Sequence, residues 1–326
     1  MDAITRQSLV TATACLIATL LAIAAGLEQP FWATITAFIV SNIDTSALVT
    51  KALLRLVGTA IGCVVGYFAA VAMEGLPFAQ AAVLFLASAI GTYGRFRSRF
   101  GYAWILGAAS VMLLVTSSMS NPTDLYIFAW TRFYEISIGV AVATVLAWGF
   151  SASGPISLQP APVAVAREAA LEQGLAAGIA AVVIALLWNW FDLPSLPQVI
   201  VTSLVVVSQD LGASRLRGAQ RMMGCILGGC LGLIVILINA ADFLWWAVAL
   251  VSGIFLASRL HLSPHKHAYV GTQIGIAFMI TLVTGGGPPD SILAPVNRLS
   301  GMVAGVAVML TVMWMMSGKL HRAVSA

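Results

Sequence analysis

The segment Arg55-Leu-Val-Gly58-Thr-Ala-Ile-Gly62-Cys-Val-Val-Gly66 decides the fold, because it returns 166 residues later as Arg221-Met-Met-Gly224-Cys-Ile-Leu-Gly228-Gly-Cys-Leu-Gly232. In both copies an arginine precedes an apolar run in which glycine occupies every fourth position. Small residues at this spacing form a smooth stripe on a helix and let a neighbouring helix approach closely within lipid. We therefore expect two related membrane helices, each packed tightly within its own half of the chain.

The same offset relates positions far from these two segments. It pairs Arg132 with Arg298, the run Gly139-Val-Ala-Val142 with Gly305-Val-Ala-Val308, and Trp148 with Trp314. One offset that holds over most of each half indicates an internal duplication rather than chance similarity.

The composition excludes a soluble fold. Of the 326 residues, 60% are hydrophobic and 9% are charged, whereas soluble domains average about 45–50% apolar and 25% charged residues. A membrane-spanning helix needs about 20 apolar residues. Twelve apolar runs approach this length, near 8–26, 30–42, 52–73, 78–93, 101–118, 126–149, 173–191, 196–208, 219–239, 243–258, 268–284 and 293–316.

The charges predict the orientation of these runs. If both termini are cytoplasmic, 14 of the 16 Lys and Arg residues lie on the cytoplasmic side. The six outside loops then hold one acid each and no base: Glu28, Glu74, Asp124, Asp192, Asp242 and Asp290. Because positive charge is retained on the cytoplasmic side, this pattern supports twelve spans with both termini inside. The net charge of +4 thus indicates topology, and no nucleic-acid partner is expected.

These observations predict an all-α, polytopic protein of the lipid bilayer with about 12 transmembrane helices. Residues 1–149 form the first six-helix repeat and 168–318 the second, joined by a Pro/Ala-rich cytoplasmic linker, 150–167, and followed by a cytoplasmic tail, 319–326. Six is even, so the repeats are parallel. Their pseudo-two-fold axis then lies along the membrane normal, and a substrate path is expected between the halves.

The second run of each half, 31–42 and 196–208, is too short to cross about 30 Å of hydrocarbon as a regular helix. Interrupted segments at matching positions of a repeat indicate a transport site, because irregular backbone at membrane depth requires a cavity. Thr34 and Trp32 are therefore candidate substrate-binding residues. Trp32 could equally belong to the aromatic belt at the membrane interface.

Two arginines, Arg132 and Arg298, fall inside the sixth span of each half. Charged groups there are costly and are by default functional. We expect Arg298, together with Arg132, to bind the carboxylate of an anionic substrate through the guanidinium fork, while Phe133 and Tyr134 offer ring surface. Glu135 lies one turn after Arg132 and is the candidate proton carrier. The alternative is a structural role, in which the arginines cap broken helices or pair with Glu135.

A second group of charges precedes the glycine stripes. Asp44 and Arg55, and their equivalents Asp210 and Arg221, would lie on one helix face and could form a cytoplasmic gate of ion pairs. The alternative is a set of surface ion pairs that contribute little.

No enzymatic or metal chemistry is indicated. The cluster of His261, His265 and His267 has no carboxylate or thiol to complete a metal site, and a solvated loop is the better interpretation. No phosphate-binding G-x-x-x-x-G-K-[ST] motif and no nucleophile with a matching base occur. We expect neither a metal, a cofactor nor an enzyme.

The Arg55–Gly62 stretch, the Arg132-Phe-Tyr-Glu135-Ile-Ser-Ile-Gly139 stretch and the twofold six-span plan resemble the fusaric acid resistance and aromatic acid exporter family of bacterial inner-membrane proteins. The resemblance implies proton-driven efflux of small aromatic or other organic acids across the inner membrane, in some members with a periplasmic adaptor. Plant malate channels are distantly similar.

Three readings of the function remain. A secondary exporter of a small organic anion, proton-coupled as the family is, comes first. A passive organic-anion channel and a non-transporting membrane scaffold are the alternatives. The sequence leaves the substrate's identity, a homo-oligomeric state and the use of an adaptor open.

Overall fold

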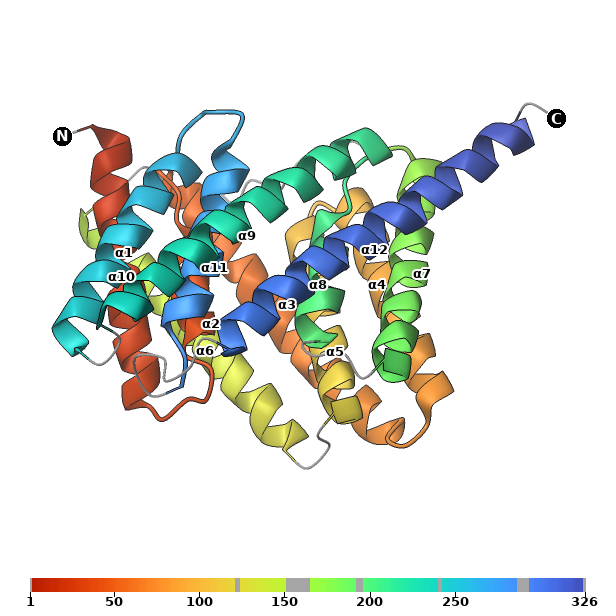
Figure 1. Ribbon diagram of the computed structural model, residues 1–326, viewed down its shortest axis with the longest axis horizontal. Coiled ribbons are helices and arrows are strands. Elements are labelled where there is room, and N and C mark those ends of the chain that lie inside the picture. Colours follow the sequence, from red (N-terminus) through yellow and green to blue (C-terminus); the bar gives the residue numbers. More distant parts are fainter. Residues whose placement is uncertain are drawn as a thin grey trace. The chain divides into compact units, whose positions relative to one another are not determined.

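Every regular element in the described part of the chain is a helix. The computed structural model describes residues 2–120, 124–150, 165–191, 196–239, 242–285 and 293–324. Across these ranges the helices are α1 (Ala3–Ala24), α2 (Phe31–Val40), α3 (Thr45–Ala72), α4 (Pro77–Arg97), α5 (Gly101–Ser120), α6 (Leu125–Phe150), α7 (Arg167–Phe191), α8 (Leu196–Val206), α9 (Leu211–Asn239), α10 (Phe243–His261), α11 (Ala268–Leu282) and α12 (Leu293–Val324) (Figure 1). The all-α prediction is confirmed.

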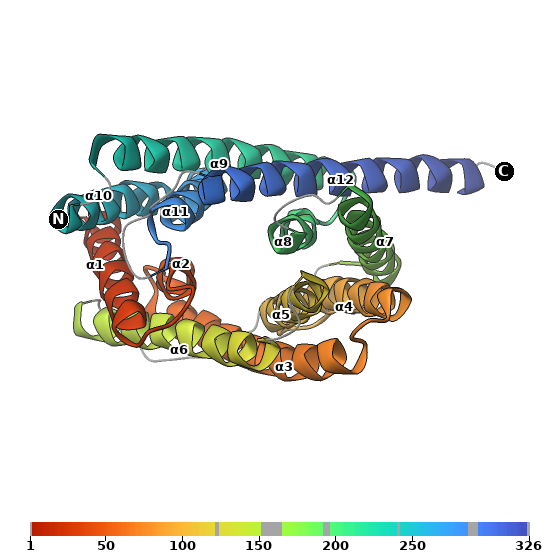
Figure 2. The same cartoon turned by 60° about the horizontal axis from the view of Figure 1, so that its bottom comes forward.

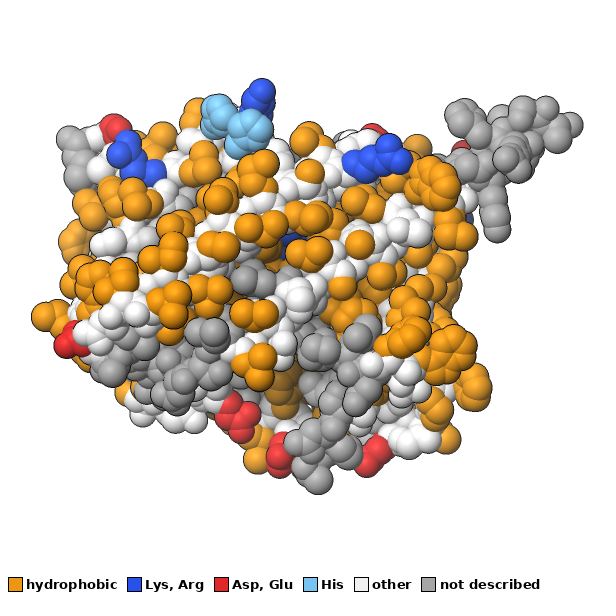
Figure 3. Space-filling model, viewed as in Figure 1, with side chains coloured by type: hydrophobic (Ala, Val, Ile, Leu, Met, Phe, Trp, Pro, Cys, Tyr) orange, Lys and Arg blue, Asp and Glu red, His pale blue; other side chains and the backbone are white. Residues whose placement is uncertain are grey.

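Eight of these helices are long and apolar enough to cross a membrane: α1, α3, α4, α5, α6, α7, α9 and α10. Their outward faces carry large apolar side chains, and Phe68 on α3, for example, is 65% exposed. Hydrophobic side chains cover most of the face drawn in Figure 3, with charged side chains mainly at its margins. This surface fits a multi-pass membrane protein, whereas a count of twelve spans remains a prediction.

The second helix of each half is short, as the sequence predicts. Helix α2 has 10 residues and α8 has 11, so each rises only about 15–17 Å, half of the hydrocarbon thickness. Helix α2 begins after Pro30, whose fixed φ suits a helix start. It ends at Ser41, where ψ turns to 134° and the backbone becomes extended.

The chain divides into two compact units. Unit 1 comprises Met1–Leu56, Thr131–Gln159 and Gln220–Leu299, and unit 2 comprises Val57–Trp130, Pro160–Ala219 and Ser300–Ala326. Each unit takes helices from both predicted repeats, and the long helices α3, α6, α9 and α12 contribute to both units. Compact units and sequence repeats are thus different divisions of the chain.

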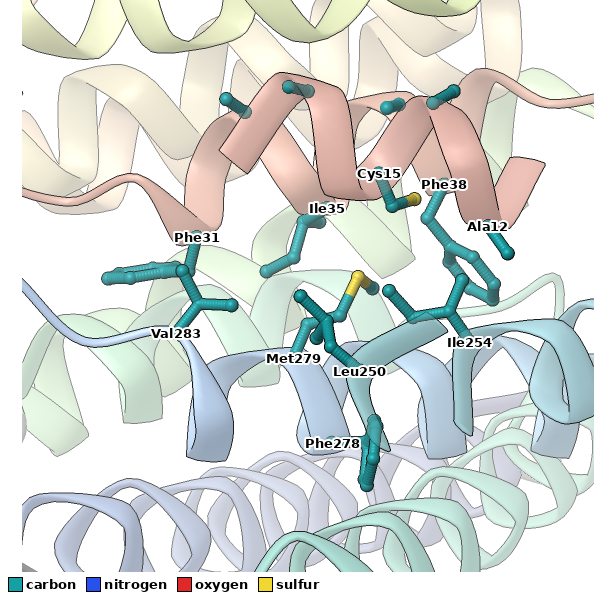
Figure 4. Packing of buried hydrophobic residues seen from close by; sticks show 14 of the residues in the cluster. Ala12, Cys15, Phe31, Ile35, Phe38, Leu250, Ile254, Phe278, Met279 and Val283 are labelled. Atoms are coloured by element: carbon teal, nitrogen blue, oxygen red, sulfur yellow. The ribbon is translucent and has the colours of Figure 1, made fainter. Parts of the chain in front are cut away.

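Unit 1 is built around α1, α2, α10 and α11. Cys15 on α1, Ile35 and Phe38 on α2, Leu250 on α10 and Met279 on α11 form one buried cluster (Figure 4). In Figure 4, Phe31 lies beside Val283 at one end of the cluster and Phe38 beside Ile254 at the other. Helix α2 lies between α6 and α11 (Figure 2), so this half-length helix is enclosed by protein.

Unit 2 repeats this plan with the equivalent helices. Helix α4 packs on α7 and α5, and α8 packs on α5 and α7. The matching pairs in unit 1 are α10 with α1 and α11, and α2 with α11 and α1. Because every pair has its counterpart one repeat away, the packing agrees with the internal duplication.

The glycine stripes pack as predicted, within each half. A Cβ on Gly58 would lie 2.5 Å from the Ala103 carbonyl oxygen, and one on Gly62 would lie 2.8 Å from Gly107 Cα, both on α5. In the second half, a Cβ on Gly228 would lie 2.9 Å from Ile274 Cα on α11. The stripes therefore seat α3 on α5 and α9 on α11 with backbones almost in contact.

We expect Gly62→Val to lower the unfolding free energy by about 1–3 kcal/mol, because its side chain would collide with α5. The measurement is the thermal unfolding midpoint of the purified protein in detergent. Gly149→Val is the matched control, since a Cβ on that exposed helical glycine meets nothing within 4 Å. Equal shifts in both variants would contradict the packing role of the stripe.

Candidate functional site

The candidate site forms where α6 passes the start of α2, inside unit 1. Arg132 and Glu135 are one turn apart on α6 and are only 6% and 1% exposed. Charged side chains in an apolar helix are turned inward because exposure to lipid is costly. The structure therefore places both groups in the protein interior.

The guanidinium of Arg132 lies over the ring of Trp32, with Cζ 3.5 Å from the ring centroid. Trp32 is itself held, since its indole Nε1–H donates to Gln29 Oε1 at 2.9 Å. A cation over the face of tryptophan is electrostatically favourable, more so when both are removed from water. The contact places the guanidinium at the first turn of α2.

The carboxylate of Glu135 binds the backbone just before α2. Its Oε1 accepts the Gln29 N–H at 2.8 Å. A backbone donor buried in a membrane must find an acceptor within the protein. Glu135 supplies that acceptor, so this acid connects α6 to the segment in which the chain enters the half-length helix.

The other predicted binding residues are placed differently. The Thr34 hydroxyl lies 2.6 Å from the Thr19 hydroxyl of α1 and 3.2 Å from the Pro30 carbonyl oxygen. It therefore stands in the α1–α2 contact and not on the face that meets Arg132. The rings of Phe133 and Tyr134 are 6.1 Å apart, and Tyr134 is exposed. The backbone of Arg298 belongs to α12, but its side chain lies outside the described residues.

Each of the four predicted gate residues takes part in a hydrogen bond. Asp44 accepts the Ser46 N–H at 2.9 Å and Asp210 accepts the Ala213 N–H at 2.7 Å, so both acids cap the helices that follow them. Arg55 donates from Nε to Thr36 Oγ1 at 3.0 Å, and Arg221 donates from Nη1 to Gln273 Oε1 at 2.6 Å. Both arginines are buried. The gate remains a prediction.

The use of acids as helix caps recurs at the protein surface. Asp2 accepts the Thr5 N–H at the start of α1, and Asp242 accepts the Trp245 N–H at the start of α10. The hydrogen bond with Thr5 lowers the pKa of the Asp2 carboxyl from its ordinary value.

Among the described residues, no group of three His, Cys, Asp or Glu side chains could hold a metal ion.

Comparison with known proteins agrees with this architecture. A family model described as "Fusaric acid resistance protein family" matches residues 5–158, and one described as "Fusaric acid resistance protein-like" matches residues 173–315. The chain belongs to the fusaric acid resistance protein family. The first match lies in the first half of the chain and the second match in the second half.

Curated relatives of this protein are named p-hydroxybenzoic acid efflux pump subunit AaeB. The protein from Escherichia fergusonii is 29% identical over 130 residues, which cover 36% of this chain and 20% of the relative. The protein from Shigella boydii serotype 4 is 29% identical over 145 residues, which cover 41% of this chain and 22% of that relative. The matched region thus spans about one fifth of these relatives' length. No solved structure matches the chain.

The sequence did not predict which groups three of the charged side chains bind: the Gln29 backbone for Glu135, Thr36 for Arg55 and Gln273 for Arg221. Thr36 had a detectable signal, because it lies four residues after Trp32 and so on the same face of α2. Gln29 and Gln273 had none, since each meets its arginine or glutamate across helices that are distant in sequence.

Removing the acceptor for the Gln29 N–H should loosen the start of α2. We expect Glu135→Ala to cost about 1–3 kcal/mol, the penalty for a buried unsatisfied donor, and to speed amide hydrogen exchange over residues 27–33. Glu135→Gln keeps an acceptor oxygen and loses only the charge, so it should change both measurements less than Glu135→Ala does. Unchanged exchange in Glu135→Ala would show that this hydrogen bond does not hold α2.

Proposed function

We propose that this protein exports small organic anions, aromatic carboxylates in particular, across the inner membrane of a bacterium, with both termini in the cytoplasm. The observation that carries the proposal is the buried guanidinium of Arg132, stacked on Trp32 beside Glu135 at the start of a half-length helix. Family membership and the names of the AaeB relatives support an aromatic acid as the cargo. A homo-oligomer and a periplasmic adaptor stay predictions.

Arg132 binds the carboxylate in this proposal. A guanidinium has a planar fork of donors that matches the two oxygens of a carboxylate. Trp32 positions the guanidinium and would offer an aromatic surface for the ring of the substrate. Arg298, the equivalent of Arg132 in the second repeat, would bind the anion in turn, and Phe133 and Tyr134 would border the route.

Glu135 couples the anion to a proton. Its carboxylate accepts the backbone N–H that precedes α2, so protonation removes charge from the group that holds this helix start. The proton and the position of α2 are thereby linked.

The transport role is tested in proteoliposomes with p-hydroxybenzoate as the probe. Wild-type protein should give saturable uptake that depends on a pH gradient. Arg132→Gln and Arg298→Gln should each lower uptake at low substrate about tenfold or more, because a charged hydrogen-bond partner is lost. Arg215→Gln, which removes an exposed charge on α9, is the control. Current without a gradient would favour a channel, and no flux of any organic anion would favour a scaffold.

The coupling role is tested separately with Glu135→Gln. We expect this variant to lose the uptake driven by a pH gradient while it still exchanges labelled for unlabelled p-hydroxybenzoate, since Arg132 is intact. Initial rates with and without an imposed gradient measure the effect. If gradient-driven uptake persists at the wild-type rate, Glu135 is not the proton carrier.

A further inference from the structure

Helices α4 and α7 of unit 2 pack closely as an antiparallel pair. A Cβ on Gly174 of α7 would lie 2.8 Å from the carbonyl oxygen of Ala89 on α4. At the end of α4, Arg97 Nη1 donates to the carbonyl oxygen of Val165, two residues before α7 begins, at 3.1 Å. Later residues of α4 thus meet earlier residues of α7, so the two helices run in opposite directions.

Both helices turn an apolar stripe outward beside this contact. Leu86 and Ile90 on α4 and Leu171 and Leu175 on α7 are 45% to 52% exposed. On each helix, these residues lie three positions before and one position after the residue that makes the close contact. Equal offsets in an antiparallel pair fall on the same side of the contact, so the four side chains form one outward surface, the α4–α7 face.

An exposed arginine stands at the same end of each stripe. Arg97 lies seven residues after Ile90, and Arg167 lies four residues before Leu171, so each shares the outward side of its helix. The hydrogen bond from Arg97 to Val165 brings the two arginines to one corner of unit 2. The α4–α7 face therefore has two guanidinium groups at one end and apolar side chains along the rest.

The apolar part of the α4–α7 face is about as deep as one leaflet of a bilayer. The stripe on α7 continues to Ile179, which is 39% exposed. The helix rises about 18 Å from Arg167 to Ile179, whereas half of the hydrocarbon core is about 15 Å. The acyl chain of one lipid can therefore lie along the face while its headgroup lies beside the arginines.

The charges at this corner favour an anionic headgroup. Arg99 adds a third exposed guanidinium, with Cζ 4.8 Å from the ring centroid of the exposed Phe100. Glu168 and Glu172 supply two carboxylates at the start of α7. Arg167 occupies the first turn of α7, where the helix dipole disfavours a cation, so its position is not explained by the stability of that helix.

We propose that the α4–α7 face binds an anionic phospholipid, with its phosphate at Arg97 and Arg167 and an acyl chain along the apolar stripes. Arginine side chains beside a membrane surface attract anionic lipids, and the stripes add apolar contact that a free anion could not use. This inference does not depend on the exported cargo.

The test measures lipid binding to the purified full chain in detergent by native mass spectrometry. Dioleoylphosphatidylglycerol is the anionic probe, and dioleoylphosphatidylcholine carries the same chains on a zwitterionic headgroup. Wild type should prefer phosphatidylglycerol. The double variant Arg97→Gln and Arg167→Gln should weaken phosphatidylglycerol binding about fivefold for each arginine removed, with phosphatidylcholine binding unchanged. Glu168→Gln should strengthen phosphatidylglycerol binding, because a nearby negative charge disappears.

The matched control is the double variant Arg6→Gln and Arg259→Gln, which removes two exposed charges from unit 1 and should keep the wild-type preference. The ratio of the two lipid affinities is independent of the amount of folded protein. If the Arg97 and Arg167 double variant folds poorly, Arg167→Gln alone carries the comparison, since loss of a cation from a helix start does not weaken the helix.

Four results would overturn the proposal. The first is a wild-type preference for phosphatidylglycerol in both the double variant and Arg167→Gln, and the second is an equal loss in the unit 1 control, which would show a general effect of charge. The third is displacement of the lipid by inorganic phosphate at equal concentration, which would indicate an anion site without lipid. The fourth is a dimer that Leu171→Ser and Leu175→Ser dissociate, which would make a second copy the occupant of this face.

Discussion

Inside a membrane, every charge and every backbone donor must be satisfied by the protein, and helix α2 concentrates this demand. A helix of 10 residues leaves irregular backbone on both sides at membrane depth. The Glu135 carboxylate takes the Gln29 N–H at one side, and Arg132 on the same helix turn stacks on Trp32. One turn of α6 thus supports the half-length helix and assembles the candidate site at the same time.

Close backbone packing makes this enclosure feasible. Gly139 lets α6 approach Thr36 on α2, and Gly275 on α11 leaves room for the ring of Phe38 on α2. The half-length helix is consequently surrounded by α1, α6 and α11 and not by lipid. Small residues are the means by which helices associate in lipid, where burial of apolar surface contributes little to the driving force. Gly139, which matches Gly305 in the second repeat, therefore also lets α6 cover Thr36 on α2.

The duplication is expressed in an unexpected way. The two halves of the sequence suggest two separate bundles, yet each compact unit combines helices of both repeats. Each unit takes the first, second and sixth helices of one repeat together with the third, fourth and fifth helices of the other. Helix α3 is long enough, at 28 residues, for its first part to serve unit 1 and its second part unit 2. A sequence offset reports ancestry and does not report which copy packs on which.

Some properties of this protein follow from the sequence alone. The apolar runs predict helices, the short second runs predict α2 and α8, and the glycine spacing predicts the close α3–α5 and α9–α11 contacts, because each is a local consequence of length or of period. The inward orientation of Arg132 and Glu135 also follows, since exposure to lipid would be too costly. Only the tertiary structure decided which groups the buried charged side chains bind. Arg55 meets Thr36 and Glu135 meets the Gln29 backbone, because these contacts depend on how helices distant in sequence come together, and no local pattern encodes that.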